Sequence, residues 1–136
     1  MKLIVVVAAI IVKDRKILCV QRGPHKFSYI SKKYEFPGGK VEKGESNEQA
    51  LEREILEELK LNIEVERCFL TVEHEYPDFK ILMHSYLCKS NGSQALQLTE
   101  HIDFKWLSVP NLDSLDWAAA DIPIVEKLQA SFNEHD

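Results

Sequence analysis

Glutamates crowd one short stretch of the sequence, and carboxylates at such density can hold metal ions. Residues 42–58 contain seven glutamates against Lys43 and Arg53, so this stretch carries a net charge of −5, the same as the whole chain. Carboxylate oxygens are ligands that suit Mg²⁺ and Mn²⁺. A solvated acidic surface with Arg53 as an ion-pair partner would have the same composition. The glutamates alone leave both interpretations open.

A helix predicted over residues 46–59 would position these glutamates. Ser46 and Gln49 fit a capping box, and neither Pro nor Gly interrupts the following turns. At about 100° per residue, three glutamates share roughly 100° of the helix surface. They are Glu54, Glu57 and Glu58, and an apolar stripe lies beside them, made of Leu51, Ile55 and Leu59. The acidic cluster should therefore border the buried face of the helix.

The loop before this helix has features of a phosphate site. Gly38 and Gly39 allow close approach of the backbone, and Lys40 adds a point charge suited to phosphate. Gly-Gly-Lys alone is a weak signal. Loop and helix together indicate a site for a metal-bound polyphosphate, because the acidic helix would repel a phosphate chain unless divalent cations lay between them.

The rest of the chain predicts strands around two helices. Strands are expected at 3–12, 16–21, 34–36, 63–76, 79–89 and 104–107, with a loop at 23–33, a turn at 91–93 and a closing helix at 122–132. Pro77 and Asp78 should join the two longest central strands as a hairpin. This interleaving predicts a single α/β domain over residues 1–136 with a mixed sheet.

Composition excludes several other classes of protein. A pI of about 5.6 argues against a general binder of nucleic-acid polymers. Three widely spaced cysteines without a C-x-x-C motif favour reduced thiols in the cytoplasm. The apolar run 3–12 is too short to cross a membrane, and Lys13, Asp14 and Arg15 follow it without a cleavage pattern. We expect a cytoplasmic protein with no membrane partner.

Residues 39–61 resemble the signature box of the Nudix hydrolases. Gly39 is followed after five residues by Glu45 and, after seven more, by Arg53-Glu54-Ile55-Leu56-Glu57-Glu58-Leu59. Segments 34–40, 75–78 and 120–123 are similar to the MutT-type branch, and segments 7–11 and 120–123 are most similar to bacterial CTP pyrophosphohydrolases. The resemblance implies the Nudix-type α/β/α sandwich with a mixed central sheet.

One position departs from that box. The family has Gly near the helix end, where this chain has Lys60. A non-glycine residue in the left-handed conformation costs roughly 1–2 kcal/mol. Asn62 could end the helix instead.

The resemblance also implies roles for the acidic residues. In this family water attacks a phosphorus of a nucleoside diphosphate-X chain, and the box carboxylates hold divalent metal, Mg²⁺ with Mn²⁺ as a substitute. Glu57 would be the central ligand, helped by Glu54, Glu58 and the carbonyl oxygen of Gly39. Arg53 would hold the carboxylates by ion pairing. Glu100, six residues before Trp106, would be a further ligand or the general base, or else an exposed loop glutamate.

For the nucleotide, the resemblance places Arg22 and Lys40 on the phosphates and Asp121 on the base. The aromatic residues that could line or stack on a base are Phe36, Tyr29 and Trp117. Simpler interpretations exist for three of these residues. Arg22 could be a surface charge, Phe36 a core residue, and Asp121 the N-cap of the following helix.

The implied function is a Mg²⁺-dependent nucleoside triphosphate pyrophosphohydrolase that yields a nucleoside monophosphate and pyrophosphate. We expect a preference for (d)CTP or a modified pyrimidine nucleotide, and a monomer or homodimer. An 8-oxo-dGTP diphosphatase is an alternative that Phe79 and Asp121 make less favourable. A nucleotide-binding module without hydrolysis is another, although such a protein would not need the complete box.

Overall fold

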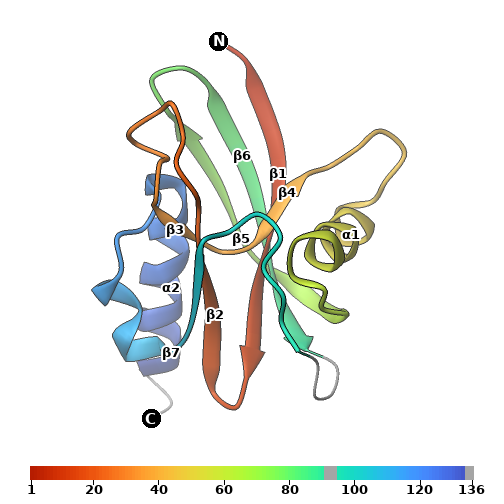
Figure 1. Ribbon diagram of the computed structural model, residues 1–136, viewed down its shortest axis with the longest axis vertical. Helices are drawn as coiled ribbons and strands as arrows, with labels where there is room; N and C mark the ends of the chain where they lie inside the picture. The colour runs from red at the N-terminus through yellow and green to blue at the C-terminus, as the bar shows by residue number, and fades with distance from the viewer. Residues whose placement is uncertain (91–94, 134–136) are drawn as a thin grey trace.

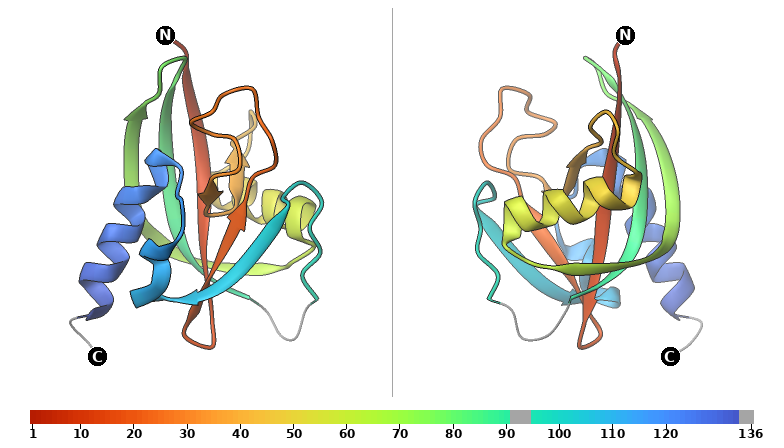
Figure 2. Two further views of the ribbon diagram at one scale, coloured as in Figure 1. Left: turned by 60° about the vertical axis from the view of Figure 1, so that its left-hand side comes forward. Right: turned by 90° about the vertical axis from the view of Figure 1, so that its right-hand side faces the viewer.

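The computed structural model describes residues 1–90 and 95–133, which form a twisted mixed sheet between two α-helices (Figures 1 and 2). The strands are β1 (Leu3–Lys13), β2 (Lys16–Gln21), β3 (Tyr34–Glu35), β4 (Gly38–Lys40), β5 (Ile63–Glu75), β6 (Lys80–Ser90) and β7 (Asp103–Ser108). The helices are α1 (Asn47–Leu59), α2 (Ile122–Asn133) and the short 3-10 helices η1 (Val109–Ser114) and η2 (Ala119–Asp121). The turn expected at 91–93 lies outside the described residues.

Strand β1 is the centre of the sheet. It pairs in parallel with β6, from Leu3 opposite Lys80 to Val12 opposite Lys89, and antiparallel with β2 and β4. The strand order is β3-β2-β1-β6-β5, with β4 also on β1 and β7 on β2. Strands β5 and β6 form the expected antiparallel hairpin.

The alternating side chains of β1 enter two different cores. Val7, Ala9 and Ile11 pack with the buried face of α1, whereas Ala8 and Ile10 pack in the cluster that contains residues of α2. A continuously apolar strand is required because both faces of the sheet are covered. Figure 2 shows α1 and α2 on opposite faces. The predicted α/β/α sandwich with a mixed sheet is confirmed.

Strand β4 was not predicted, because glycines and proline usually stop a strand. Gly39 lies opposite Val7 in the register, and Gly38 lies opposite Ala8. A Cβ at Gly38 would collide with the carbonyl oxygen of Val7. The glycine therefore permits this pairing, and the pairing brings the loop against the central strand.

Helix α1 begins as predicted and ends in the conformation that the family normally gives to glycine. The Ser46 hydroxyl accepts from the Gln49 N–H at 3.1 Å, and the Gln49 side chain accepts from the Ser46 N–H at 2.9 Å. Lys60 is left-handed, with φ 58° and ψ 32°, and its N–H donates to Leu56. The helix therefore ends at Leu59, before Asn62.

Replacing Lys60 with glycine should stabilise the protein. Glycine adopts the left-handed conformation without the Cβ penalty, although it also loses more entropy on folding, so we expect a net gain of about 1 kcal/mol in the free energy of unfolding. Urea unfolding would measure it. Lys60→Ala is the matched control, because it removes the same side chain and keeps the strain. Equal stability of the two variants would contradict this explanation.

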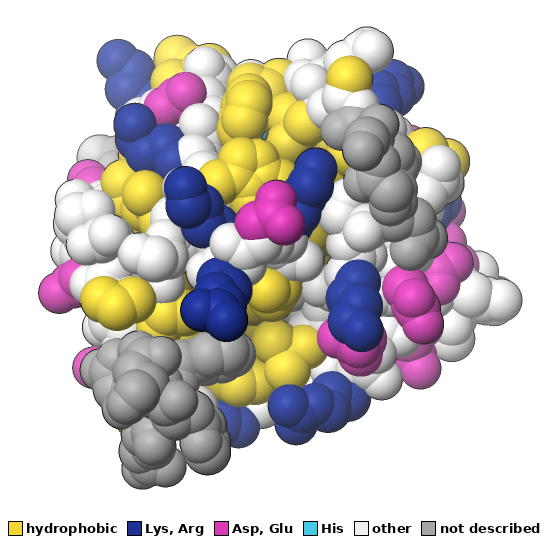
Figure 3. Space-filling model, turned by 90° about the horizontal axis from the view of Figure 1, so that it is seen from below, with side chains coloured by type: hydrophobic (Ala, Val, Ile, Leu, Met, Phe, Trp, Pro, Cys, Tyr) yellow, Lys and Arg dark blue, Asp and Glu magenta, His cyan; other side chains and the backbone are white. Residues whose placement is uncertain are grey.

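The surface is mixed in character. On the face in Figure 3, basic side chains are scattered among apolar patches, and the largest group of acidic side chains lies toward the right, with others at the centre and the left edge. Within residues 1–90 and 95–133, no helix is both long and apolar enough to span a membrane.

Candidate active site

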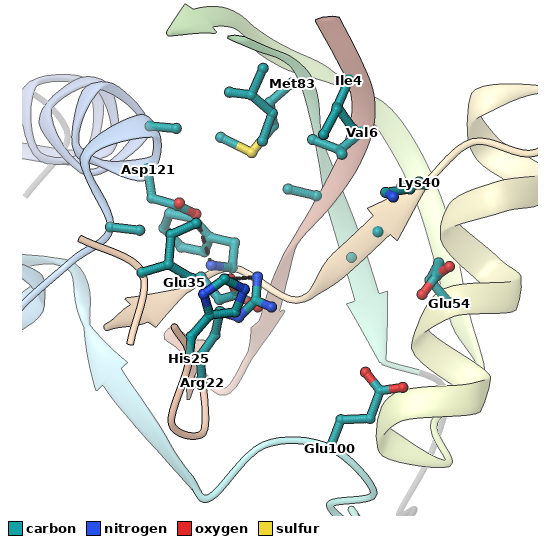
Figure 4. Close-up of a pocket in the computed structure, with 18 of the residues that line it drawn as sticks. Ile4, Val6, Arg22, His25, Glu35, Lys40, Glu54, Met83, Glu100 and Asp121 are labelled. Carbon is teal, nitrogen blue, oxygen red and sulfur yellow. Dashed lines mark hydrogen bonds and ion pairs between the residues drawn. The ribbon is translucent and has the colours of Figure 1, made fainter. Parts of the chain in front are cut away.

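A cavity of about 900 Å³ lies beside the sheet, lined by residues of β1, β4, β6 and α1 and by the segments 22–30, 100–101 and 118–121. This volume is in the range of small-molecule sites. Figure 4 shows its two ends. Ile4, Val6 and Met83 form an apolar wall along one side, with Asp121 at one end, while Glu54 from α1 and Glu100 from the segment below it lie at the other end. One end therefore suits an aromatic ring and the other suits cations.

Arg53 organises the acidic end. Its guanidinium donates to both carboxylate oxygens of Glu45 at 2.7 and 2.9 Å, to Glu54 at 3.0 Å and to Glu57 at 3.4 Å. It also donates to the carbonyl oxygen of Lys40 at 3.1 Å, which fastens α1 to β4. Arg53 thus lies among the carboxylates as the sequence predicted.

The three box glutamates lie in different environments. The side chain of Glu57 is 60% exposed, that of Glu54 is 17% exposed and that of Glu58 is 3% exposed. Burial and the neighbouring Glu54 raise the pKa of Glu58 well above its usual value. Among the described residues, Oε2 of Glu58 has no hydrogen-bond partner. A buried oxygen without a partner is costly, and a cation would relieve that cost.

Gly39 lies directly against the carboxylate of Glu54. A Cβ at Gly39 would lie 2.5 Å from Cδ of Glu54, so only glycine lets β4 and this carboxylate approach each other. Across residues 1–90 and 95–133, no three acidic, histidine or cysteine side chains converge on one point. Magnesium is usually held by one or two carboxylates plus water and substrate oxygens. Glu54 and Glu58 beside an open cavity fit that pattern.

The segment 97–102 joins the end of α1 to β2 and carries Glu100. Gln97 donates to the carbonyl oxygen of Leu59, and Thr99 donates through its N–H and hydroxyl to the last turn of α1. The N–H of Ile102 then donates to Gln21 at 3.0 Å. These bonds satisfy helix-end carbonyls and place Glu100 and His101 on the cavity wall.

A second set of polar side chains lines the cavity, and Figure 4 shows two of its members, Arg22 and Glu35, side by side. Arg22 lies 3.7 Å from Glu35, and Nε2 of His101 lies 3.1 Å from the other oxygen of Glu35. Sequence reasoning missed Glu35 and His101. Their only signal was a position beside residues already selected, next to Phe36 and Glu100.

Asp121 lies at the apolar end, 5% exposed, in the 3-10 turn before α2. Its Oδ1 accepts a hydrogen bond from the Phe36 N–H at 3.0 Å. Burial and the nearby Glu35 raise the pKa of Asp121 well above its usual value. This bond does not support the alternative interpretation of Asp121 as an N-cap, because the carboxylate is held against the backbone of Phe36 beside the cavity.

The three aromatic residues that the sequence suggested for base binding differ in their position relative to the cavity. Phe36 lines the cavity and stacks on Trp117, with ring centroids 4.7 Å apart. Trp117 donates its ring N–H to Leu112, and Tyr29 stacks on Tyr76 and donates to Asp78. Among the described residues that line the cavity, Tyr29 and Trp117 are absent, whereas Arg22, Lys40, Phe36 and Asp121 are present.

Replacing Asp121 with asparagine should stabilise the metal-free protein at alkaline pH. Because the folded state raises the pKa of Asp121, it holds that proton more tightly than the unfolded chain does, so the wild-type stability falls as pH rises above the ordinary carboxyl range. The variant keeps an oxygen for the Phe36 N–H and does not titrate. Thermal melts should show its advantage widening between pH 5 and pH 8. Exposed Asp113→Asn is the control, and a constant difference across this range would contradict the argument.

Known proteins resemble this chain over nearly its whole length. Residues 2–128 match the model of the NUDIX domain. The chain is 39% identical over 131 residues to the CTP pyrophosphohydrolase of Escherichia coli K12, across 96% of this chain and 94% of that protein. It is 32% identical over 102 residues to the 8-oxo-dGTP diphosphatase of the same organism, across 75% and 78% of the two chains. The solution structure of the E. coli ORF135 protein superposes with a TM-score of 0.80 at 38% identity, covering 96% of this chain and 91% of that one.

Proposed function

The chain belongs to the Nudix family, and from this premise we propose that it is a Mg²⁺-dependent nucleoside triphosphate pyrophosphohydrolase. It hydrolyses a nucleoside triphosphate to the monophosphate and pyrophosphate. The observation that carries this proposal is the pair of box carboxylates, Glu54 and Glu58, at the wall of a cavity of about 900 Å³. Nudix hydrolases generally use divalent metal ions.

The residues of the acidic end would act as follows. Glu54 and Glu58 supply oxygen ligands from α1, together with Glu57 and the carbonyl oxygen of Gly39. Arg53 holds Glu54 in place by its 3.0 Å hydrogen bond. A divalent ion bound here would polarise the phosphoryl oxygens and lower the pKa of the attacking water. Glu100 faces the same end of the cavity, where it would take a proton from the attacking water or supply a further metal ligand.

Lys40 and Arg22 would contact the phosphate chain from opposite sides. Both line the cavity, Lys40 at the acidic end and Arg22 in the middle. Their cationic side chains offset the phosphate charge that the glutamates would otherwise repel. With the base at the far end, the phosphate chain is directed toward α1.

A cytosine base is the preference that we propose. A carboxylate at Asp121 can accept from the 4-amino group of cytosine, and Phe36 offers a ring face beside it. The relative named as a CTP pyrophosphohydrolase matches 96% of this chain. Modified pyrimidine nucleotides that keep the 4-amino group carry the same donor and belong to the proposed substrate class.

The alternative substrate is 8-oxo-dGTP. A carboxylate at Asp121 can also accept from N1–H and N2–H of a guanine-like base. The relative named as an 8-oxo-dGTP diphosphatase is 32% identical to this chain. Phe79, an apolar residue of the cavity wall, offers no hydrogen bond to the added oxygen.

A panel of triphosphates with product identification tests both proposals. We expect pyrophosphate and a monophosphate with Mg²⁺ and none with EDTA, and the highest kcat/KM with CTP, dCTP or a modified pyrimidine. A clear preference for 8-oxo-dGTP over every cytosine nucleotide would reverse the order of substrates. Nucleotide binding without pyrophosphate release would instead indicate a non-catalytic module.

We also propose that residues 1–136 act as one domain in the cytoplasm, as a monomer or homodimer, without a nucleic-acid or membrane partner. The cysteines Cys19, Cys68 and Cys88 are free thiols, as expected for a reducing compartment. Light scattering of the purified protein would distinguish monomer from dimer.

A further inference from the structure

None of the roles described above explains His101, which lies on the cavity wall between the carboxylates of Glu35 and Glu58. Its side chain is 4% exposed, and it stands at the wall that Glu58 and Glu35 share. Nε2 of the ring lies 3.1 Å from Oε2 of Glu35 and 3.8 Å from Oε1 of Glu58. Nε2 therefore faces two carboxylates, that of Glu35 from β3 and that of Glu58 from α1.

The backbone on both sides fixes this position. Thr99, two residues earlier, is bonded to the last turn of α1, and Ile102, the next residue, is bonded to Gln21 of β2. A segment held at two points so close together leaves the ring little freedom to move away. The imidazole is thus presented to Glu58 by the same bonds that shape the end of α1.

The two oxygens of Glu58 have different surroundings. Oε1 faces His101 at 3.8 Å, while Oε2 has no hydrogen-bond partner among the described residues. A carboxylate can turn about its terminal bond, so a neighbour on one oxygen decides where the other one points. His101 therefore leaves Oε2 as the oxygen available to a cation.

From this geometry we propose that His101 is a positioning residue, which orients Glu58 for metal and links it through Glu35 to Arg22. This inference rests on the proposed function, because it assigns Glu58 to metal binding. Residues that hold a ligating carboxylate typically contribute 10–100-fold to metal affinity or activity. Through Glu35, His101 also connects Arg22, which would contact the phosphate chain, with Glu58, which would bind the metal.

The other ring nitrogen distinguishes this role from simple packing. Within the described part of the chain, Nδ1 of His101 is buried without a hydrogen-bond partner. A buried polar atom left unpaired reduces stability. Leucine removes the unpaired Nδ1 but also the 3.1 Å contact of Nε2 with Glu35, so His101→Leu should leave the melting temperature in EDTA nearly unchanged while weakening metal binding.

Mn²⁺ titrations of the full chain without nucleotide, followed by electron paramagnetic resonance of the free ion, provide the test. His101→Leu and His101→Asn should weaken Mn²⁺ binding by about 10-fold or more. His101→Gln should restore most of it, because its amide nitrogen reaches the position of Nε2 and the shorter asparagine does not. His84→Leu is the matched control, since His84 bonds Thr71 outside the cavity. Melts in EDTA and kcat and KM with Mg²⁺ complete the set.

The outcomes separate the two proposals. An active wild-type enzyme whose His101 variants all bind Mn²⁺ equally well overturns the role of His101 and leaves the proposed function standing. Weaker binding in the glutamine variant, equal to that in the leucine variant, also overturns it, as does a loss of melting temperature that accounts for every change. A wild-type protein that neither binds Mn²⁺ nor releases pyrophosphate overturns both.

Discussion

Glu58→Gln is expected to lower kcat by at least about 100-fold, because the metal-ligand role that we propose for Glu58 would supply several kcal/mol of transition-state stabilisation. The same change should raise the free energy of unfolding of the metal-free protein at pH 8. Glu58 is buried beside Glu54, and its pKa is raised by that burial and by that neighbour. Glutamine keeps the shape of the side chain and carries no charge. Activity and stability should therefore change in opposite directions.

The pH dependence gives the sign of the stability change. The folded state holds the Glu58 proton more tightly than the unfolded chain, so the wild-type stability is fully present below the unfolded pKa of 4.5 and declines as pH rises beyond it. The variant lacks this decline. Urea unfolding in EDTA at pH 5 and pH 8 would measure the difference, which should be larger at pH 8.

Two glutamates on the same helix serve as comparisons. Glu52→Gln removes an exposed charge and should change neither kcat nor stability. Glu57→Gln should leave folding nearly intact, since its side chain is 60% exposed, and should remove most of the activity. Near-normal turnover in Glu57→Gln would show that Glu57 is not the central ligand, and near-normal turnover in Glu58→Gln would contradict the first prediction.

Gly39→Ala is the second change with a large expected effect, a loss of about 100-fold in kcat/KM. The added methyl group would lie 2.5 Å from Cδ of Glu54. Either β4 or the carboxylate must move, and a displacement of about 1 Å at a reacting site can cost 100-fold in rate. Steady-state kinetics and Mn²⁺ binding should both weaken.

Gly44→Ala is the matched control for this substitution. Gly44 has a positive φ of 89°, and nothing lies within 4 Å of a Cβ built there. Alanine at Gly44 should cost about 1 kcal/mol of stability through backbone strain alone, with kcat/KM unchanged. Equal activity losses in the two variants would show that general destabilisation, rather than the position of Glu54, explains the effect.

Local sequence patterns correctly predicted the elements whose formation depends on residues close together in the chain. The capping box at Ser46 and the apolar stripe of α1 are present, and the β5–β6 hairpin forms as expected. The angular positions of the glutamates around the helix also agree with their different environments. Glu58 falls beside the apolar stripe and is buried, whereas Glu57 falls on the far side of the arc and is exposed.

The features that the sequence did not predict depend mostly on contacts between residues far apart in the chain. β4 forms because Gly38 and Gly39 meet Ala8 and Val7 of β1, which lie 30 and 32 residues earlier in the chain. His101 and Glu35 meet only after β7 and β3 have both paired with β2. The 3-10 helices η1 and η2, also not predicted, are too short to produce a hydrophobic period. Such contacts depend on the completed sheet.

The parallel pairing of β1 with β6 also has a consequence during synthesis. Residues 3–12 of β1 are all apolar, and their pairing with β6 extends to Lys89. During synthesis, β2 and β4 can pair with β1 early, but the edge of β1 that pairs with β6 stays open until most of the chain has left the ribosome. Nascent chains halted before β6 should depend on chaperones and aggregate without them, because an exposed apolar strand is a template for association.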